Sequence, residues 1–201
     1  LFPYTTLFRS IAIVKYWGKA DAERMIPSTS SISLTLENMY TETKLSFLPE
    51  DATGDVMYID DELQGEKETT KASKVLDLFR TNPNQHVKIE TWNNMPTAAG
   101  LSSSSSGLSA LVKAANELFQ VGKTQSELAQ IAKFASGSSS RSFFGPLAAW
   151  DKDSGEVYPV ETDLKLAMIM LVLTDQKKPV SSRDGMKLCT ETSTSFPGHR
   201  Y

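Results

Sequence analysis

The sequence predicts an α+β fold, and three observations lead to that prediction. Several strand-like segments come before the first helix-like segment, two helix-like segments later follow each other directly, and further strand-like segments come after them. This order differs from the regular alternation of strand and helix that builds a doubly wound parallel sheet. The 201 residues are 40% hydrophobic and 22% charged, a composition typical of a globular domain with a sizeable core.

The first part of the chain is predicted to consist mainly of strands. Residues 11–14 (IAIV) form a short apolar run, and residues 31–36 (SISLTL) alternate strictly, as a half-buried strand does. Residues 41–48 and 56–59 are predicted as further strands because proline and glycine separate them. Residues 67–80 then carry apolar side chains at helical spacing and are predicted to form the first helix.

The second part of the chain mixes helices with strands. Residues 87–92 are predicted as a strand, and apolar residues over 108–119 recur at the spacing of one buried helix face. A second helix is predicted around residues 128–135. Residues 147–150 and 164–173 are predicted as strands, and the latter contains the longest apolar run, which is far too short to cross a bilayer.

Charge and cysteine content exclude several classes of function. The net charge of −3 gives no general attraction to nucleic acid or to an anionic membrane, so we expect neither as a partner. The single Cys189 excludes an internal disulfide framework and is typical of a reducing cytoplasm. His86 and His199 are far apart and have no ligand partners at suitable spacing, which argues against a zinc site.

Five consecutive serines, residues 102–106, stand where the 108–119 helix is about to begin, in the stretch PTAAGLSSSSSG. The first turn of a helix has unpaired backbone N–H groups and the positive end of the helix dipole. Gly100 allows a ligand to approach the backbone closely, and serine hydroxyls add donors without bulk. These features predict a phosphate cradle; the alternative is a serine N-cap with extra serines facing solvent. The Walker-A and G-x-S-x-G patterns are both absent.

Cationic side chains stand beside small hydrogen-bond donors at three further places. Arg141 follows a second serine cluster and could offer its planar fork to a carboxylate or phosphate, or could simply lie at an exposed helix end. Lys15 and Lys19 flank an aromatic pair in KYWGK, which could also be a surface loop with solvated lysines. Ser182 and Arg183 form the third group. Together these groups favour a small polyanionic ligand.

These stretches resemble a known family. PTAAGLSSSSSG resembles the P-x-x-x-G-L-x-S-S motif of the GHMP small-molecule kinases. More narrowly, IAIVKYWGK (11–19), NNMPTAAGL (93–101) and ASGSSSRS (135–142) resemble the diphosphomevalonate decarboxylases, in the style of bacterial enzymes from Gram-positive cocci. The similarity covers about residues 11–195, and the KYWGK and GS-x-x-R stretches are specific to the decarboxylases within the superfamily.

The resemblance implies a GHMP-kinase N-terminal domain, which has a ribosomal protein S5 domain 2-like fold, in a cytoplasmic homodimer. It also implies a reaction that depends on ATP and Mg²⁺. Mevalonate 5-diphosphate would be phosphorylated on its tertiary hydroxyl, and loss of that phosphate and of CO₂ would give isopentenyl diphosphate. Positioning and charge neutralisation dominate phosphoryl transfer of this kind. Mg²⁺ would arrive with ATP, and Ser103 is the one side chain expected to contact it.

The resemblance also assigns roles by position. Lys15, Arg141 and Ser103 would lie at the reacting end, where Arg141 would hold the substrate carboxylate. The residues expected to bind ATP are Asn93, Pro96, Thr97, Ala98, Ala99, Gly100, Leu101, Ser102, Ser103 and Ser104. The residues expected to bind mevalonate 5-diphosphate are Tyr16, Trp17, Gly18, Lys19, Ser136, Gly137, Ser138, Ser139, Ser140, Arg141, Ser182 and Arg183.

Two departures from the family pattern stand out. Ser10 replaces the asparagine that precedes the Ile-Ala pair, and the D-A-G-P-N motif that carries the family's catalytic aspartate is absent from these 201 residues. We therefore expect residues 1–10 to be a foreign or mistranslated segment and residues 11–195 to be the ATP- and substrate-binding domain with the start of a C-terminal domain. Most of that C-terminal domain is expected to be missing, with 196–201 an irregular, truncated end and the chain inactive alone.

Two alternatives to the decarboxylase remain open at this point. The first is a related GHMP kinase that phosphorylates without decarboxylating, against which KYWGK and Arg141 argue. The second is an inactive fragment or a domain that only binds a ligand, which the missing aspartate favours for this chain.

Overall fold

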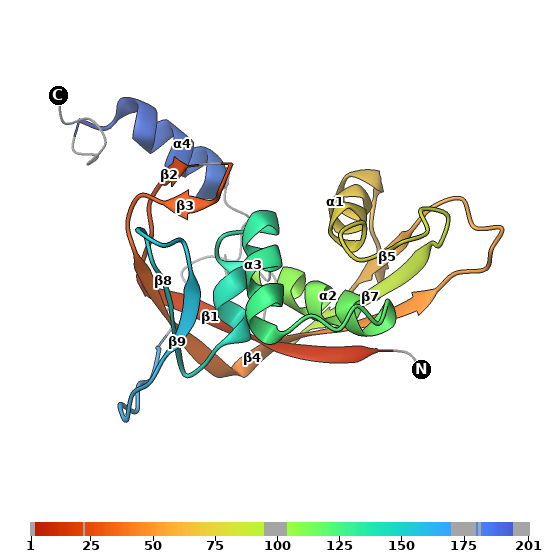
Figure 1. The fold of residues 1–201 in the computed structure, drawn as a ribbon, viewed down its shortest axis with the longest axis horizontal. Helices are drawn as coiled ribbons and strands as arrows, with labels where there is room; N and C mark the ends of the chain where they lie inside the picture. Colours follow the sequence, from red (N-terminus) through yellow and green to blue (C-terminus); the bar gives the residue numbers. More distant parts are fainter. Residues whose placement is uncertain (1–2, 22, 95–103, 170–179, 181, 195–201) are drawn as a thin grey trace.

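Helices cover one face of a curved β-sheet whose other face is open (Figure 1). The structure is a computed structural model, and it describes residues 3–21, 23–94, 104–169, 180 and 182–194. The α+β class predicted from the sequence is confirmed by this arrangement. Within the described part of the chain, no helix combines the length and the apolar character needed to cross a membrane.

The sheet is organised around one long central strand, β4 (Ser31–Phe47). β1 (Tyr4–Val14) runs antiparallel along one edge of β4 over most of its length. The opposite edge is shared, because β7 (Val87–Asn93) pairs with the C-terminal half of β4 and β8 (Leu147–Trp150) pairs with residues 31–34. The remaining strands are β5 (Val56–Ile59), β6 (Glu62–Leu63) and β9 (Val157–Val160), in the order β6–β5–β7–β4–β8–β9.

Three helices pack on the sheet: α1 (Glu66–Leu76), α2 (Ser104–Leu118) and α3 (Gln125–Ala135) (Figure 1). α3 begins at a capping box in which Thr124 accepts from the Glu127 backbone N–H and the Glu127 carboxylate accepts from the Thr124 N–H. Small residues let α2 and α3 approach the sheet closely. Completely buried core residues include Leu45, Leu76, Val87, Ala110, Val112, Ala114, Ala115, Ala129 and Ala132.

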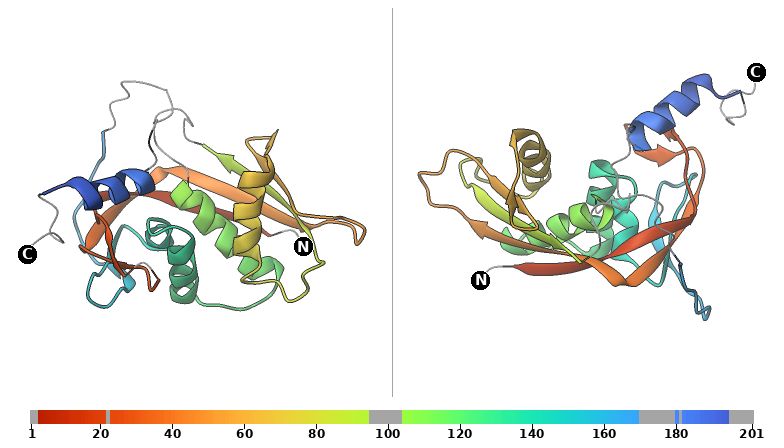
Figure 2. Two further views of the ribbon diagram at one scale, coloured as in Figure 1. Left: turned by 90° about the horizontal axis from the view of Figure 1, so that it is seen from above. Right: turned by 180° about the vertical axis from the view of Figure 1, so that it is seen from behind.

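Four further elements complete the described structure. They are the hairpin of β2 (Lys19–Asp21) and β3 (Ile26–Pro27), the 3₁₀ helix η1 (Ser139–Phe143) and helix α4 (Ser182–Thr192). All three views place α4 beside the β2–β3 hairpin (Figures 1 and 2).

Three predicted strand boundaries were wrong. The two strands predicted over 31–36 and 41–48 form the single strand β4, which pairs with β1 on both sides of a register shift at residues 37–39. β1 begins at Tyr4 rather than at Ile11, since Thr5 and Leu7 point into the core while their neighbours face outward. The foreign origin proposed for residues 1–10 stays a prediction.

The strand predicted over 164–173 is not formed in its described part. Residues 161–169 have no regular structure, and Leu164 and Ile169 are 68% and 85% exposed. Alternation and apolar character alone do not make a strand where no neighbouring strand offers backbone hydrogen bonds. Residues 170–173 lie outside the described part.

A buried carboxylate fastens α1 to the sheet. Asp55 accepts hydrogen bonds from the Arg80 guanidinium at 2.6 Å, from the Ser73 hydroxyl at 2.6 Å and from the Val87 N–H at 2.8 Å, and His86 Nδ1 lies 3.7 Å away. Burial by itself raises the pKa of Asp55, but the hydrogen bonds from Arg80, Ser73 and Val87 outweigh it and hold that pKa below its ordinary value of 3.8.

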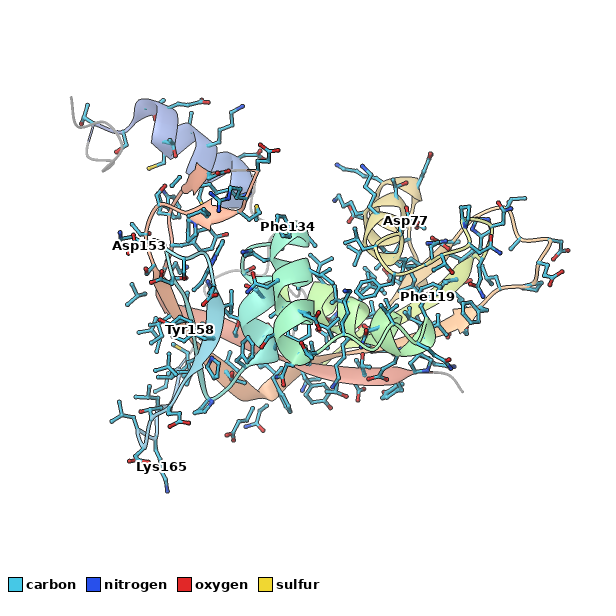
Figure 3. The ribbon with its side chains drawn as sticks, in the orientation of Figure 1. Asp77, Phe119, Phe134, Asp153, Tyr158 and Lys165 are labelled. Atoms are coloured by element: carbon cyan, nitrogen blue, oxygen red, sulfur yellow. The ribbon has the colours of Figure 1, made fainter. Side chains whose placement is uncertain are left out.

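Replacing Asp55 by asparagine is expected to destabilise the fold by roughly 3 kcal/mol, because Arg80 would keep a buried charge without its main partner. The wild-type advantage should be complete above the unfolded-state pKa of Asp55 and disappear as the pH falls through its lower folded-state pKa. Urea unfolding of the wild type and of Asp55→Asn, from neutral to acidic pH, measures this difference in the free energy of unfolding. The control is Asp77→Asn, at the end of α1 (Figure 3), since Asp77 also contacts Arg80 but is 60% exposed and should contribute less than about 1 kcal/mol. Equal losses from the two variants would contradict the prediction.

Candidate active site

Two loops predicted to bind the ligand meet over the buried side chain of Trp150. Tyr16 comes from the loop after β1, and its ring lies 4.7 Å from the Trp150 ring, centroid to centroid, at 66°. Gly137 comes from the loop between α3 and η1 and lies against the same tryptophan. The structure therefore brings together the KYWGK and SGSSSR stretches, which are 120 residues apart in the chain, on one side of β8.

Gly137 stands where no side chain fits. A Cβ atom added there would lie 2.7 Å from two ring carbons of Trp150 and 3.1 Å from the Tyr16 hydroxyl. Trp150 is completely buried, so its ring cannot turn out into solvent to make room for that atom. Glycine is thus required at this position by the close approach of the loop to the aromatic pair.

Arg141 is the most unusual charge in the structure. It lies in η1 with only 3% of its surface exposed, and its guanidinium carbon is 5.8 Å from the centre of the Tyr16 ring. Its Nε donates to the Ser33 hydroxyl at 3.1 Å and its Nη1 donates to the Ser31 hydroxyl at 2.7 Å. Among the described residues, no carboxylate forms an ion pair with Arg141. The helix-end alternative for Arg141 is wrong, because this side chain is buried.

Burial disfavours the charged form of Arg141. It lowers the pKa of Arg141 to about 10, and interaction with Tyr16 offsets only part of that effect. The guanidinium therefore remains protonated at neutral pH. A buried positive charge held by neutral hydroxyls is costly unless an anion completes its environment. The site is consequently suited to a carboxylate or phosphate ligand.

The loop that carries the lysines is tied to the segment before β4. Gly18 has a positive φ of 79°, a conformation that glycine adopts without strain. The Gly18 carbonyl accepts from the Ser28 N–H at 3.3 Å, and the Trp17 N–H donates to the Thr29 hydroxyl at 3.1 Å. Lys15 and Lys19 are both exposed at this anchored loop.

The second serine cluster divides into two groups. Ser136 and Ser138 are partly exposed and their hydroxyls lie 3.2 Å apart, so they remain accessible candidates for ligand contact. Ser139 and Ser140 are completely buried, and the Ser140 hydroxyl donates to the Gly137 carbonyl at 3.0 Å. This geometry gives Ser140 a role in shaping the loop, and direct ligand contact by Ser139 and Ser140 stays a prediction.

Part of the predicted ATP site lies outside the described residues, namely Pro96, Thr97, Ala98, Ala99, Gly100, Leu101, Ser102 and Ser103. Its two ends are described: β7 ends at Asn93 and α2 begins at Ser104. The Asn93 side-chain oxygen accepts from the Thr41 hydroxyl at 2.8 Å, and its amide nitrogen lies 3.4 Å from an Asp60 oxygen. The stretch thus leads from an anchored strand end into a helix N-terminus, whose first turn carries no acidic residue.

The later serines of the first cluster have a structural role. Ser105 and Ser106 are buried, and the Ser106 hydroxyl lies 2.7 Å from the Thr41 hydroxyl of β4. The Ser109 hydroxyl contacts the Ser105 carbonyl at 2.7 Å and the Ser139 carbonyl at 2.6 Å. These contacts place the start of α2 directly against the 3₁₀ helix that carries Arg141. The expectation of extra serines facing solvent is wrong for Ser105 and Ser106.

Ser182 and Arg183 begin helix α4, beside the hairpin that starts at Lys19 (Figure 2). Their backbone positions are described, whereas the positions of their side chains are not. Contact between the Arg183 guanidinium and a ligand stays a prediction.

Sequence reasoning did not identify three residues of the site: Ser31, Ser33 and Trp150. The strict alternation in SISLTL predicted a half-buried strand with both serines on one face, and it assigned no role to them. In the structure, Ser31 and Ser33 are 4% and 1% exposed. A pair of serines on a strand that has strands on both sides is the signal that could have indicated a buried polar partner.

Comparison with known proteins identifies relatives along nearly the whole chain. Residues 8–158 match the model of the diphosphomevalonate decarboxylase-like N-terminal domain family. The structure of mevalonate pyrophosphate decarboxylase from Streptococcus pyogenes is 65% identical, with a TM-score of 0.91, and the match covers 98% of this chain and 62% of that one. The resemblance to enzymes of Gram-positive cocci is in line with this match.

Two further relatives extend the comparison. The diphosphomevalonate decarboxylase of Candida albicans is 34% identical over 95% of this chain and 59% of its own length. A structure in complex with MVAPP, AMPPCP and magnesium is 36% identical, with a TM-score of 0.82, over 96% of this chain and 62% of that one. The chain thus spans about three fifths of the length of these relatives.

Proposed function

Because this chain belongs to the diphosphomevalonate decarboxylase-like N-terminal domain family, we propose that it binds mevalonate 5-diphosphate and ATP for the ATP-dependent formation of isopentenyl diphosphate, ADP, phosphate and CO₂. Arg141 holds the carboxylate of the substrate. Tyr16, Lys19 and the accessible serines of residues 136–138 hold its diphosphate, together with Arg183 from α4. Lys15 and Ser103 act at the reacting end.

One observation carries this proposal. Arg141 is 3% exposed, is held by two neutral hydroxyls and has no carboxylate partner among the residues described. The contrast within this chain is Arg80, whose buried guanidinium is paired with the carboxylate of Asp55. The free charge of Arg141 therefore suits an anionic ligand.

The phosphate of ATP would be held at the N-terminus of α2. The fit rests on the helix start at Ser104, on the absence of acidic residues from the first turn of α2 and on the packing of the next turn, through Ser109, against η1. When bound, Mg²⁺ supplies charge neutralisation of the ATP phosphates. The solved relative in complex with MVAPP, AMPPCP and magnesium supports the same pair of ligands here.

The order of events at the reacting end follows from charge. The carboxylate is fixed by Arg141 while the tertiary hydroxyl attacks the terminal phosphoryl group of ATP. ADP leaves, and the hydroxyl proton passes to the family's aspartate in the complete enzyme. The backbone and hydroxyl donors before α2 would supply hydrogen bonds to the transferred group. Loss of the phosphate and release of CO₂ then transfer the electrons of the C–C bond into the new double bond. The protein's part is to hold both anionic ends of the substrate in fixed positions.

Two alternatives remain distinguishable. A GHMP kinase without decarboxylation would leave a phosphorylated product and no CO₂, whereas a domain that only binds would consume no ATP.

We further propose that the protein is a cytoplasmic homodimer. The homodimer rests on family resemblance, and the cytoplasmic location rests on the resemblance and on the single cysteine.

The 201-residue chain alone is expected to release no CO₂ from labelled mevalonate 5-diphosphate with ATP and Mg²⁺, because it carries no D-A-G-P-N aspartate. Losing a base of this kind typically costs about 10²–10⁴-fold in rate. Joining these residues to the C-terminal part of the Streptococcus pyogenes relative should restore CO₂ release that depends on ATP.

The complete Streptococcus pyogenes enzyme is the control for this experiment. Phosphorylation without CO₂ from the joined protein would favour the kinase alternative. Release of CO₂ by the 201-residue chain within about tenfold of the control would contradict the role of the missing aspartate.

A further inference from the structure

Two hydroxyls of the central strand determine how Arg141 is held. Ser31 and Ser33 lie two residues apart on β4, so both point to the same side of the sheet, and both are nearly completely buried. The Ser33 hydroxyl accepts from Nε of Arg141, the Ser31 hydroxyl accepts from Nη1, and the Ser33 hydroxyl also lies 3.5 Å from the Ala148 carbonyl of β8.

We propose that Ser31 and Ser33 are positioning residues that orient the guanidinium of Arg141 and keep its charge available for the ligand. This inference rests on the proposed function, because it concerns the anion that Arg141 receives. The two hydroxyls hold the guanidinium at two separated donors, because Nη2 lies between the N–H groups of Nε and Nη1 around its plane. They leave Nη2 without a partner among the described residues, and Nη2 is therefore the donor group presented to the anion.

Because the partners of Arg141 are hydroxyls rather than carboxylates, its positive charge is not neutralised within the protein. An aspartate at residue 31 or 33 would orient the guanidinium equally well but would neutralise it, as Asp55 neutralises Arg80 elsewhere in this chain. Serine fixes the geometry without supplying a negative charge. The orientation of the Arg141 guanidinium and the availability of its charge are thus separate properties. Alanine at residue 31 or 33 disturbs the orientation, whereas aspartate at residue 31 removes the available charge.

The support for the guanidinium is rigid as well as neutral. β4 is paired on both edges at Ser33, which lies opposite Ala12 of β1 and opposite Ala148 of β8, and Ser31 lies opposite Trp150 of β8. The ring of Tyr16 lies 5.8 Å from the guanidinium carbon and limits movement on that side. A positively charged group held this way binds an anion without first losing its own freedom of movement.

The test compares Ser31→Ala, Ser33→Ala and Ser31→Asp with the wild-type chain. Calorimetric titration with mevalonate 5-diphosphate gives the dissociation constant, and urea unfolding gives stability. Each alanine variant should bind about tenfold more weakly, because one charge-assisted hydrogen bond that orients Arg141 is lost. Ser31→Asp should bind at least about a hundredfold more weakly, since the ligand must compete with an internal carboxylate, while its stability is maintained or raised.

A second measurement is independent of the ligand. The Nε–H proton of Arg141, followed by NMR, should exchange with water at least about tenfold faster in Ser33→Ala than in the wild type, because its acceptor is gone. Two control variants remove hydroxyls that do not contact Arg141: Ser30→Ala removes an exposed acceptor of the Lys152 N–H, and Thr43→Val removes a buried hydroxyl of the same strand. Neither should change the exchange rate or the affinity.

The outcomes separate the inference from the proposed function. A wild-type chain that does not bind mevalonate 5-diphosphate would contradict the proposed function, and unchanged Nε–H exchange in Ser33→Ala would overturn the inference whether or not the chain binds. If the wild type binds and Ser31→Asp binds equally well, the inference is also overturned. Loss of affinity in Ser31→Asp with stability retained supports it, because a purely structural role predicts that both fall together.

Discussion

Replacing Arg141 by methionine is expected to stabilise the ligand-free chain and to remove its affinity for mevalonate 5-diphosphate. The two effects have one cause. The guanidinium is buried and has no carboxylate partner among the described residues, so folding the chain desolvates a charge that only a ligand would compensate. Methionine fills a similar volume and carries no charge.

The expected gain in the free energy of unfolding is at least about 1 kcal/mol, within the range found when buried ionic groups give way to apolar ones. The expected loss of affinity is at least about a hundredfold, because the anionic end of the ligand would contact an uncharged methionine side chain in place of the guanidinium. The affinity of Arg141→Lys for the ligand should lie between those of the wild type and Arg141→Met, since lysine keeps the charge but loses the planar fork.

Urea unfolding measures the first effect, and the ligand-induced rise of the unfolding midpoint measures the second. Asp55→Asn provides the contrast, because it removes the partner of a paired arginine and should lower stability without altering the site. A methionine variant that is less stable than the wild type would mean that Arg141 supports the fold rather than a ligand.

Gly137→Ala is expected to lower the affinity for mevalonate 5-diphosphate by roughly ten- to a hundredfold and to destabilise the fold by about 1–3 kcal/mol. The added Cβ would lie 2.7 Å from the Trp150 ring and 3.1 Å from the Tyr16 hydroxyl. Because Trp150 is completely buried, relief must come from movement of the loop or of Tyr16, and both carry proposed ligand contacts.

A second substitution tests that explanation. Trp150→Phe removes the part of the ring that the new methyl group would meet, so the double variant should recover part of the stability lost in Gly137→Ala. A double-mutant cycle measures this recovery as a coupling between the two positions. Strictly additive losses would show that Gly137 and Trp150 do not constrain each other.

The sequence predicted the elements whose patterns depend on local packing. β5 and β8 were predicted with the boundaries that they have, and α3 was predicted close to its own, because apolar residues mark each of these segments. The strand predicted over 164–173 failed in its described part because strand formation depends on a partner, and the periodicity of one segment carries no information about its neighbours.

The site was predictable as a set of residue types and less so as a geometry. Tyr16, Gly137 and Arg141 were identified and do lie together. That Arg141 is buried on Ser31 and Ser33, with Trp150 beneath the loop, depends on the pairing of β8 with the start of β4, which no local pattern encodes. Serines 139, 140, 105 and 106 looked equally available in the sequence, but packing against neighbouring elements buries them.

The most direct test asks whether Arg141 recognises a carboxylate. Mevalonate 5-diphosphate and isopentenyl diphosphate share the diphosphate, but only the first has a carboxylate, and their dissociation constants from the 201-residue chain can be compared by calorimetry. We expect the wild type to prefer mevalonate 5-diphosphate by at least about tenfold and Arg141→Met to bind the two compounds almost equally. Equal affinity of the wild type for both compounds, or a preference that persists in Arg141→Met, would contradict the assignment of Arg141 to the carboxylate.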